Sequence, residues 1–105
     1  MSGNYCLVLV TCGSHDEAGA IARRLVTDGL AAGVQRLPIS SVYTWKGDTV
    51  EDDEVLLICK TRSDLFDEIE SVVAEMHSYD VPPILQISID SASAPYLGWI
   101  DEVTK

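Results

Sequence analysis

Two short runs in this sequence are apolar at every position, and they constrain the fold more than any other feature. The runs cover residues 6–10 (Cys-Leu-Val-Leu-Val) and 55–59 (Val-Leu-Leu-Ile-Cys). A strand with one face in water alternates apolar and polar residues, whereas a strand covered on both faces is a continuous apolar run. We therefore predict two central strands, in a sheet that is packed against something on each face.

Each apolar run is followed by a pattern typical of an amphipathic helix. After the first run, Ser14 and Glu17 have the spacing of a capping box, and Gly29 suits the C-terminal cap of the helix that follows. After the second run, Ser63 is placed to cap a helix whose apolar stripe continues to His77. The two halves of the chain therefore each predict a strand followed by a helix.

The remaining segments predict two more strands and a final helix. Residues 32–45 read as a strand interrupted at Pro38, which implies a bulge or an edge position. A turn over residues 46–48 predicts a hairpin back into the second apolar run. Residues 84–89 alternate like a strand with one wetter face, and Pro95 suits the first turn of a short last helix.

The predicted order is βαββαβ plus a terminal helix, within a single domain spanning residues 1–105. This is the α+β, ferredoxin-like split βαβ sandwich. In that fold both long helices cover the same face of the sheet, so the central strands leave an apolar back face. We therefore predict a homo-oligomer that packs through the backs of its sheets, with Tyr43 and Trp45 part of the contact.

Charge and composition exclude several classes of function. The formal net charge is −10, which opposes binding to a nucleic acid backbone. No apolar run reaches the roughly 18 residues that a membrane span needs, so no membrane partner is expected. The acidic run over residues 48–54 lacks the pattern of a calcium loop and is expected to be a solvated hairpin. Three cysteines without CxxC spacing, and no signal-peptide pattern, predict free thiols and a cytoplasmic location.

The segment 76–83 is the most concentrated group of polar side chains. His77, Tyr79 and Asp80 fall within four residues, and Pro82 and Pro83 stiffen the backbone after them. One interpretation is a fixed polar array for binding at the end of an element. The alternative is a helix that ends on His77, with the imidazole facing the negative end of the helix dipole and Tyr79 filling the core.

No pattern for catalysis is recognisable in the sequence. A Gly-rich phosphate loop, a metal triad and a recognisable nucleophile paired with a histidine are all absent. Cys12 and His15 are close enough in sequence for a nucleophile pair to be conceivable, but adjacency along the chain does not establish geometry. We expect that the protein is not an enzyme.

Several spaced motifs together resemble the CutA family of divalent-cation tolerance proteins. These motifs are Leu-Val-Thr at 9–11, Leu-Ala-Ala-Gly-Val at 30–34, Val-Tyr-Thr-Trp-Lys-Gly at 42–47, Lys-Thr at 60–61, His-Ser-Tyr-Asp-Val-Pro at 77–82 and Tyr-Leu-Gly-Trp at 96–99. The resemblance covers nearly the whole chain. It implies a tight homotrimer of ferredoxin-like subunits, similar in architecture to the PII signalling proteins, which bind small effectors in clefts between subunits. It does not imply catalysis.

The resemblance leads to two hypotheses about the ligand. The first is a divalent metal ion, with copper preferred and no obligatory cofactor, bound by His77 with Asp80 as a second ligand. The family pattern His-Pro-Tyr-Glu-x-Pro-Glu is altered here, with Asp80 for Glu and Pro83 for the last Glu, and Gly33 replaces the family's Cys. A metal site would therefore have fewer thiol and carboxylate ligands than the family pattern supplies.

The second hypothesis is a PII-like sensor that binds a small polar or anionic metabolite and has no metal role. Trp45, Tyr79 and Trp99 would then line a cleft between subunits, and Lys60 would pair with an anionic group. Packing in the core or at an interface is the competing interpretation of these aromatic side chains. A third possibility, a stable scaffold for other proteins, is neither favoured nor excluded by the sequence.

Overall fold

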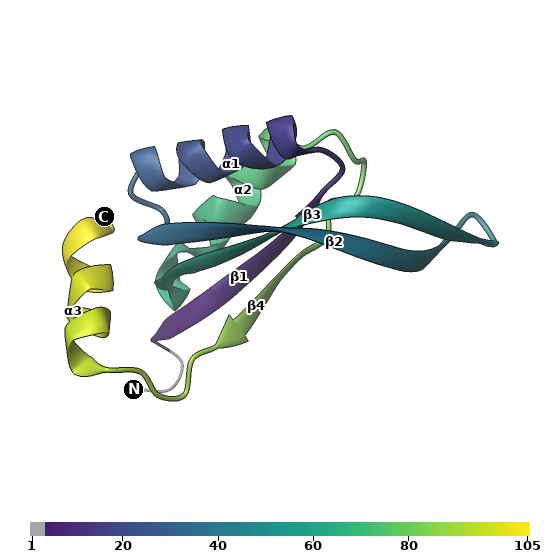
Figure 1. The fold of residues 1–105 in the computed structure, drawn as a ribbon. Coiled ribbons are helices and arrows are strands. Elements are labelled where there is room, and N and C mark those ends of the chain that lie inside the picture. Colours follow the sequence, from purple (N-terminus) through teal and green to yellow (C-terminus); the bar gives the residue numbers. More distant parts are fainter. Residues whose placement is uncertain (1–3) are drawn as a thin grey trace.

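The computed structural model describes residues 4–105, which form a four-stranded antiparallel sheet with helices on one face (Figure 1). The strands are β1 (Tyr5–Cys12), β2 (Gly33–Trp45), β3 (Asp48–Arg62) and β4 (Ile84–Ser88), and the helices are α1 (His15–Thr27), α2 (Phe66–Met76) and α3 (Ala94–Val103), with a short 3-10 turn, η1 (Ser63–Leu65), before α2. The sheet order β2-β3-β1-β4 is that of the ferredoxin-like split βαβ arrangement, as predicted. None of the described helices has the length and apolar character needed to cross a membrane.

The core lies between the sheet and helices α1 and α2. Alternate residues of β1 face the helices and are fully buried, and the second apolar run contributes the corresponding positions of β3. Each of the two helices buries two large apolar side chains that lie one turn apart on the same face. The central residues of this core are Val8, Val10, Leu57, Ile21, Leu25, Ile69 and Val73.

Pro38 lies within an unbroken edge strand, so the predicted interruption is wrong, and of the two alternatives for Pro38, a bulge or an edge position, the edge position is confirmed. β2 pairs with β3 in one constant register, from Gly33 opposite Lys60 to Trp45 opposite Asp48. Among the described strands, β3 is the one neighbour of β2 in the sheet. A proline lacks a backbone N–H, and an edge strand tolerates that loss because one of its sides needs no partner.

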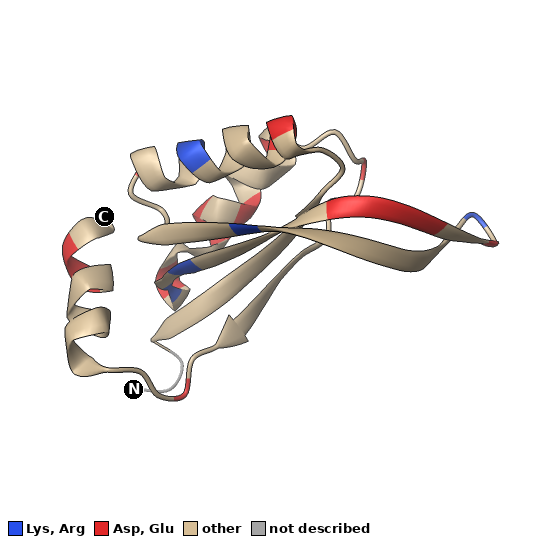
Figure 2. Cartoon of the chain, in the orientation of Figure 1, with Lys and Arg blue, Asp and Glu red and all other residues tan. Residues whose placement is uncertain are grey.

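The β2–β3 hairpin extends beyond the helices as a projecting arm (Figure 1). The molecule is correspondingly long, with extents of 44 × 25 × 22 Å. The acidic run forms the first half of β3, which is red in Figure 2, and its acidic side chains are exposed as predicted, with Glu54 as the one buried exception. The arm therefore carries a dense negative charge away from the body of the subunit.

The face of the sheet opposite α1 and α2 is apolar and uncovered in the single chain. Leu7 and Leu9 of β1 lie directly opposite Ile87 and Leu85 of β4, and Leu9 also lies opposite Ile58 of β3. Side chains of directly opposed residues point to the same face. Leu85 and Ile87 are 50% and 46% exposed. We call these five residues the apolar back face.

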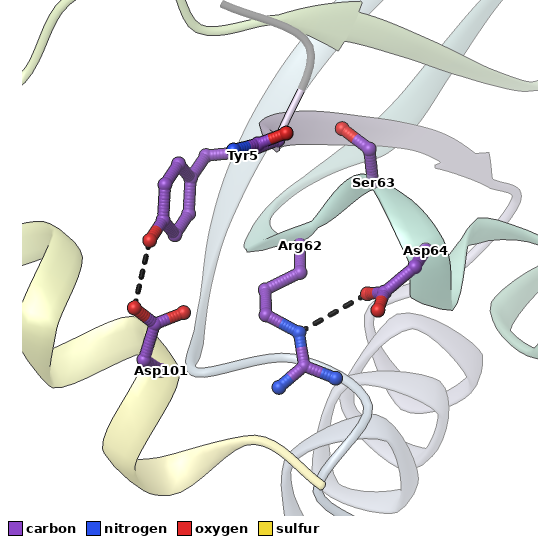
Figure 3. A pocket seen from close by; sticks show the side chains of 6 residues that line it. Tyr5, Arg62, Ser63, Asp64 and Asp101 are labelled. Carbon is purple, nitrogen blue, oxygen red and sulfur yellow. Dashed lines mark hydrogen bonds and ion pairs between the residues drawn. The ribbon is translucent and has the colours of Figure 1, made fainter. Parts of the chain in front are cut away.

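Helix α3 stands at one end of the sheet instead of covering the apolar back face (Figure 1). Ser93 caps its first turn by accepting a hydrogen bond from the backbone N–H three residues later. The Tyr5 hydroxyl donates to Asp101 at 2.7 Å, and Arg62 donates to Thr104 Oγ1 at 3.2 Å. Figure 3 shows the Tyr5–Asp101 bond at this end of the sheet. These contacts attach α3 to the ends of the two central strands, β1 and β3, and leave the back face open.

Ser63 does not cap α2, so that prediction is wrong. Ser63 is the first residue of η1, and α2 begins only at Phe66. The N-cap of α2 is Leu65, which makes no side-chain capping bond. The 3-10 turn delays the helix by three residues, and Ser63 is therefore too far from the free N–H groups of the first turn of α2.

Candidate functional site

His77 connects the end of α2 to the end of β1. It is the C-cap of α2, as predicted, and its side chain is fully buried. The imidazole does not face the end of its own helix, because Nε2 lies 2.6 Å from the backbone carbonyl oxygen of Thr11. A carbonyl can only accept, so Nε2 carries the proton. Nδ1 is then the acceptor, and the backbone N–H of Tyr79 donates to it at 3.1 Å.

Glu17 lies in the first turn of α1 and faces His77. The Ser14 hydroxyl accepts a hydrogen bond from the Glu17 N–H at 3.2 Å, which confirms half of the predicted capping box. The Glu17 carboxylate does not return the bond. It accepts instead from the backbone N–H and the hydroxyl of Ser78, at 2.7 and 3.1 Å. One of its oxygens, Oε2, lies 3.9 Å from Nδ1 of His77.

Cys12 completes a group of three possible metal ligands. It is the last residue of β1 and is fully buried. One ligand atom from each of Cys12, Glu17 and His77 lies within 4.8 Å of the other two. Burial, together with the charges of Glu17 and Glu54, raises the pKa of the Cys12 thiol to about 11. We call this group the Cys–Glu–His cluster.

The donor set of the Cys–Glu–His cluster fits a divalent transition metal. Thiolate, imidazole and carboxylate bind zinc at roughly 2.0–2.3 Å, so the cluster would close around one ion by a shift of about 1 Å. Metal-binding histidines usually donate their other ring N–H to a carbonyl or carboxylate. His77 already does so through Nε2, and this leaves Nδ1 directed at Glu17. An ion would replace the N–H of Tyr79 as the partner of Nδ1.

The sequence interpretation placed Asp80 beside His77 and did not include Cys12 or Glu17 in the metal site. Asp80 is exposed and is not a member of the Cys–Glu–His cluster. Glu17 was assigned only to helix capping, and Cys12 lies 65 positions before His77. The pairing of Cys12 with the histidine at the end of α2 depends on the long-range packing of β1 against that helix end. The one local signal was that Cys12 and Glu17 flank the first strand–helix junction.

The Cys12–His15 nucleophile pair is not formed among the described residues. His15 is the exposed first residue of α1 and makes no hydrogen bond to Cys12. The raised pKa of Cys12 also keeps the thiol protonated near neutral pH, whereas a nucleophilic cysteine needs a lowered pKa. The neighbours of Cys12 are Glu17 and His77 instead.

A separate cavity of about 390 Å³ lies between the arm and the loop after α2. Three of the sequence-predicted residues, Trp45, Tyr79 and Asp80, line it together with Tyr43 and Asp52 of the arm, Ser78 and Val81. Tyr79 is half-buried and does not fill the core, because its hydroxyl donates to Glu54 Oε2 at 2.7 Å. Burial and the bond to Glu54 raise the pKa of Tyr79.

The other two predicted cleft residues lie at the far end of β2. Lys60 pairs with Gly33 at the start of that strand and binds the side chain of Gln35. The Trp99 ring lies 3.4 Å from the position that a Cβ at Gly33 would occupy. Trp45, by contrast, ends β2. Within one chain the predicted cleft therefore divides into two groups that are separated by the length of a 13-residue strand.

Comparison with known families identifies a match over almost the entire chain. Residues 6–103 match the sequence model described as CutA1 divalent ion tolerance protein. The divalent-cation tolerance protein CutA of Thermus thermophilus is 39% identical over 99 residues, which is 93% of this chain and 96% of that protein. Protein CutA of Mus musculus is 38% identical over 98% of this chain. The match spans 59% of the length of the mouse protein.

Solved structures give the same result for the fold. The structure described as the periplasmic divalent cation tolerance protein CutA from Archaeoglobus fulgidus has a TM-score of 0.94 at 39% identity, and the match covers 96% of this chain and 99% of that one. The structure of CutA1 from Oryza sativa also has a TM-score of 0.94, at 34% identity, with 99% and 96% covered.

Proposed function

The chain belongs to the CutA1 divalent ion tolerance family, and on that premise we propose that it binds a divalent metal ion through its Cys–Glu–His cluster. The role is binding and not catalysis. In this proposal Cys12 supplies a thiolate, His77 an imidazole nitrogen and Glu17 a carboxylate oxygen. Of the two metal ligands predicted from the sequence, His77 and Asp80, this proposal keeps His77. Asp80 lines the neighbouring cavity instead.

The observation that carries the proposal is the orientation of the His77 ring. Nε2 donates its proton to the Thr11 carbonyl, so Nδ1, which accepts from the Tyr79 N–H, is the ring nitrogen that lies 3.9 Å from Glu17 Oε2 within a buried site. The Cys12 thiol and the Glu17 carboxylate also each place a ligand atom within 4.8 Å of the same imidazole, which packing alone does not require. The arrangement is the one in which a metal ion gains a preoriented imidazole ligand.

Copper is the preferred ion in this proposal. Soft thiolate and imidazole ligands favour copper, and among divalent ions the order of affinity rises to a maximum at copper. Binding requires the Cys12 thiol to lose its proton, so the ion has to compete against a pKa of about 11. No further cofactor is required. The three free, buried cysteines are consistent with the reducing cytoplasm that we propose as the location.

The apolar back face supports a homo-oligomer, and we propose the trimer that the family resemblance implies. Leu85 and Ile87 together with the half-buried leucines of β1 form a continuous apolar surface across three strands. A surface of this kind is usually covered by a partner when a protein is in solution. A second copy of the same chain carries the same apolar surface. Sedimentation velocity at micromolar concentration tests the proposal, because a stable monomer would contradict it.

The experiment that tests metal binding compares matched variants of the intact protein. Zinc(II) is added to wild type, Cys12→Ser, Glu17→Gln and Asp80→Asn, and affinity is measured by isothermal titration calorimetry. Loss of the thiolate or the carboxylate should weaken binding by at least about tenfold, and Asp80→Asn should leave it unchanged. Equal affinity of Cys12→Ser and wild type would contradict the cluster, whereas a loss confined to Asp80→Asn would restore the sequence-predicted pair.

A small metabolite is the second candidate ligand, and the cavity at Trp45 and Tyr79 favours it. The cavity has aromatic walls and the carboxylates of Asp80 and Asp52, which would select a polar ligand with a flat or cationic part. A thermal-shift screen of metabolites distinguishes this PII-like role, since a ligand of the native state raises the melting temperature. A ligand whose effect is lost in Trp45→Ala and kept in Cys12→Ser would support the sensor.

A further inference from the structure

A groove between α1 and the edge strand β2 holds two arginines that have no acidic partner. The groove has a volume of about 320 Å³, and none of the residues that line it belongs to the Cys–Glu–His cluster. Arg23 comes from α1 and Arg36 from β2. Neither makes an ion pair or a side-chain hydrogen bond within residues 4–105.

This lack of pairing is unusual for the charge of the chain. Acidic residues outnumber Lys and Arg by 17 to 7, so carboxylates are abundant on the surface. The other two arginines are both paired, Arg24 with Asp28 at 2.6 Å and Arg62 with Asp64 at 3.1 Å. Figure 2 shows red positions spread over the arm and the helices, with blue positions sparse among them. Arg23 and Arg36 are therefore available to an anion from outside the chain.

Gly19 brings the two guanidinium groups together. The position that a Cβ at Gly19 would occupy lies 2.6 Å from Arg36 Nη1 and 3.1 Å from Arg23 Nη1. Any other residue at Gly19 would displace the end of Arg36. Two like charges held side by side repel each other unless an anion lies between them, so the glycine permits an arrangement that is unfavourable without a ligand.

The chemistry of the groove selects a small phosphate-bearing ligand. Guanidinium groups donate parallel N–H pairs that match the oxygens of a phosphate, and two of them offset its double negative charge. Ala22, Val26 and Val34 line the rest of the groove and offer apolar contact to an organic portion. The net charge of −10 disfavours long polyanions such as nucleic acids but acts only weakly on a small ion.

We propose that the groove formed by Arg23, Arg36 and Gly19 binds the phosphate group of a small molecule. The site is independent of the metal proposal, because it shares no residue with the Cys–Glu–His cluster. Its ligand is recognised through charge and through paired N–H donors, and its specificity for the remainder of the molecule comes from the apolar wall. The probe for the test is inorganic phosphate, because it has the phosphate group that the two arginines would recognise and lacks the organic part of the ligand.

The test follows the Nε–Hε signals of the arginines in ¹⁵N-labelled intact protein. Phosphate replaces chloride at constant ionic strength, so bulk screening does not change during the titration. The expected result is a saturable shift of the Arg23 and Arg36 signals, with Arg24 and Arg62 unchanged because carboxylates already occupy them. Equal, non-saturating shifts of all four signals would overturn the proposal.

Three variants test the geometry of the groove. Arg36→Gln should weaken phosphate binding about tenfold, because one charged bidentate partner is lost. Lys46→Gln removes the same charge at the tip of the arm and should have no effect. Gly19→Ala keeps both charges and suits a helix, yet it displaces the end of Arg36, so it should also weaken binding. Equal losses in Arg36→Gln and Lys46→Gln, or wild-type binding by Gly19→Ala, would contradict the site.

Discussion

Nε2 of His77 donates a hydrogen bond to the backbone carbonyl oxygen of Thr11 at 2.6 Å, across 66 positions of sequence. This bond joins the end of α2 to the end of β1 and fixes the protonated nitrogen of the ring. The same contact therefore supports the fold and leaves Nδ1 at 3.9 Å from Glu17 Oε2, beside which Cys12 completes the Cys–Glu–His cluster. The structural role of His77 and its proposed metal-binding role therefore rest on the same side chain.

Replacing His77 should destabilise the protein even without metal. His77→Ala leaves the buried carbonyl of Thr11 and the N–H of Tyr79 without their partners, and we expect a loss of about 2–3 kcal/mol in the free energy of unfolding. Urea denaturation in the presence of a chelator measures it. His15→Ala is the matched control, because His15 is exposed and should change stability by less than about 0.5 kcal/mol. Equal stabilities of the two variants would contradict the buried role of His77.

Cys59 should make stability fall with rising pH in the alkaline range. Burial raises the pKa of its thiol from 9.0 to about 12 in the folded state. Above pH 9 the unfolded chain releases this proton while the folded chain retains it, so stability falls as pH rises between 9 and about 12. The stability gap between wild type and Cys59→Ala should narrow by up to about 1.4 kcal/mol per pH unit in this window. Denaturant titrations at about pH 8.5 and about pH 10.5, on either side of the unfolded-state pKa, measure the gap, and a constant gap would contradict the prediction.

The apolar back face should respond sharply to one charge. Ile87→Glu places a carboxylate among Leu7, Leu9 and Leu85, and burying it in an interface without a partner is strongly unfavourable. We expect sedimentation velocity to show monomers for this variant and an oligomer for wild type. Val103→Glu on α3 is the control, because it adds the same charge to an exposed apolar site away from this face. Oligomers in both variants would refute an interface at the back of the sheet.

Two glycines should respond in opposite directions to alanine. Gly29 follows α1 with a φ of 71°, in the left-handed region that disfavours a side chain. Gly29→Ala should therefore lower the free energy of unfolding by about 1 kcal/mol. Gly98 lies within α3, and a Cβ added there would meet no neighbouring side chain or element within 4 Å. Because alanine favours a helix over glycine, Gly98→Ala should raise the free energy of unfolding by about 0.5–1 kcal/mol. Thermal unfolding of both variants checks the two signs. A gain from Gly29→Ala would show that α1 ends differently.

The sheet and both long helices could be predicted because their signals are local. Wholly apolar runs identify the two central strands, periodicity identifies both helices that follow, and a capping residue places the start of α1 alone. The edge position of Pro38 was predicted on the same basis. The bulge was not formed, because an edge strand can accommodate the missing N–H with no change of register.

The candidate site was less predictable because its residues meet only through tertiary packing. Glu17 has the spacing of a capping box, yet its carboxylate bonds to Ser78, which lies 61 positions away. Cys12 meets His77 where β1 ends beneath the loop after α2. Asp80 is close to His77 in sequence but faces the cavity beside the arm. Proximity along the chain thus points to Asp80 as the partner of His77, whereas the fold brings Glu17 and Cys12 close to it.

The central claim is a thiolate–imidazole–carboxylate site for a divalent ion, and cobalt(II) tests it most directly. Cobalt(II) substitutes for such ions and gives a thiolate-to-metal charge-transfer absorption when a cysteine coordinates it. Titration of reduced protein should produce this absorption with saturation at one ion per chain, and Cys12→Ser should abolish it. A charge-transfer band that persists in Cys12→Ser, or no band in wild type at saturating cobalt, would contradict the Cys–Glu–His cluster as the metal site.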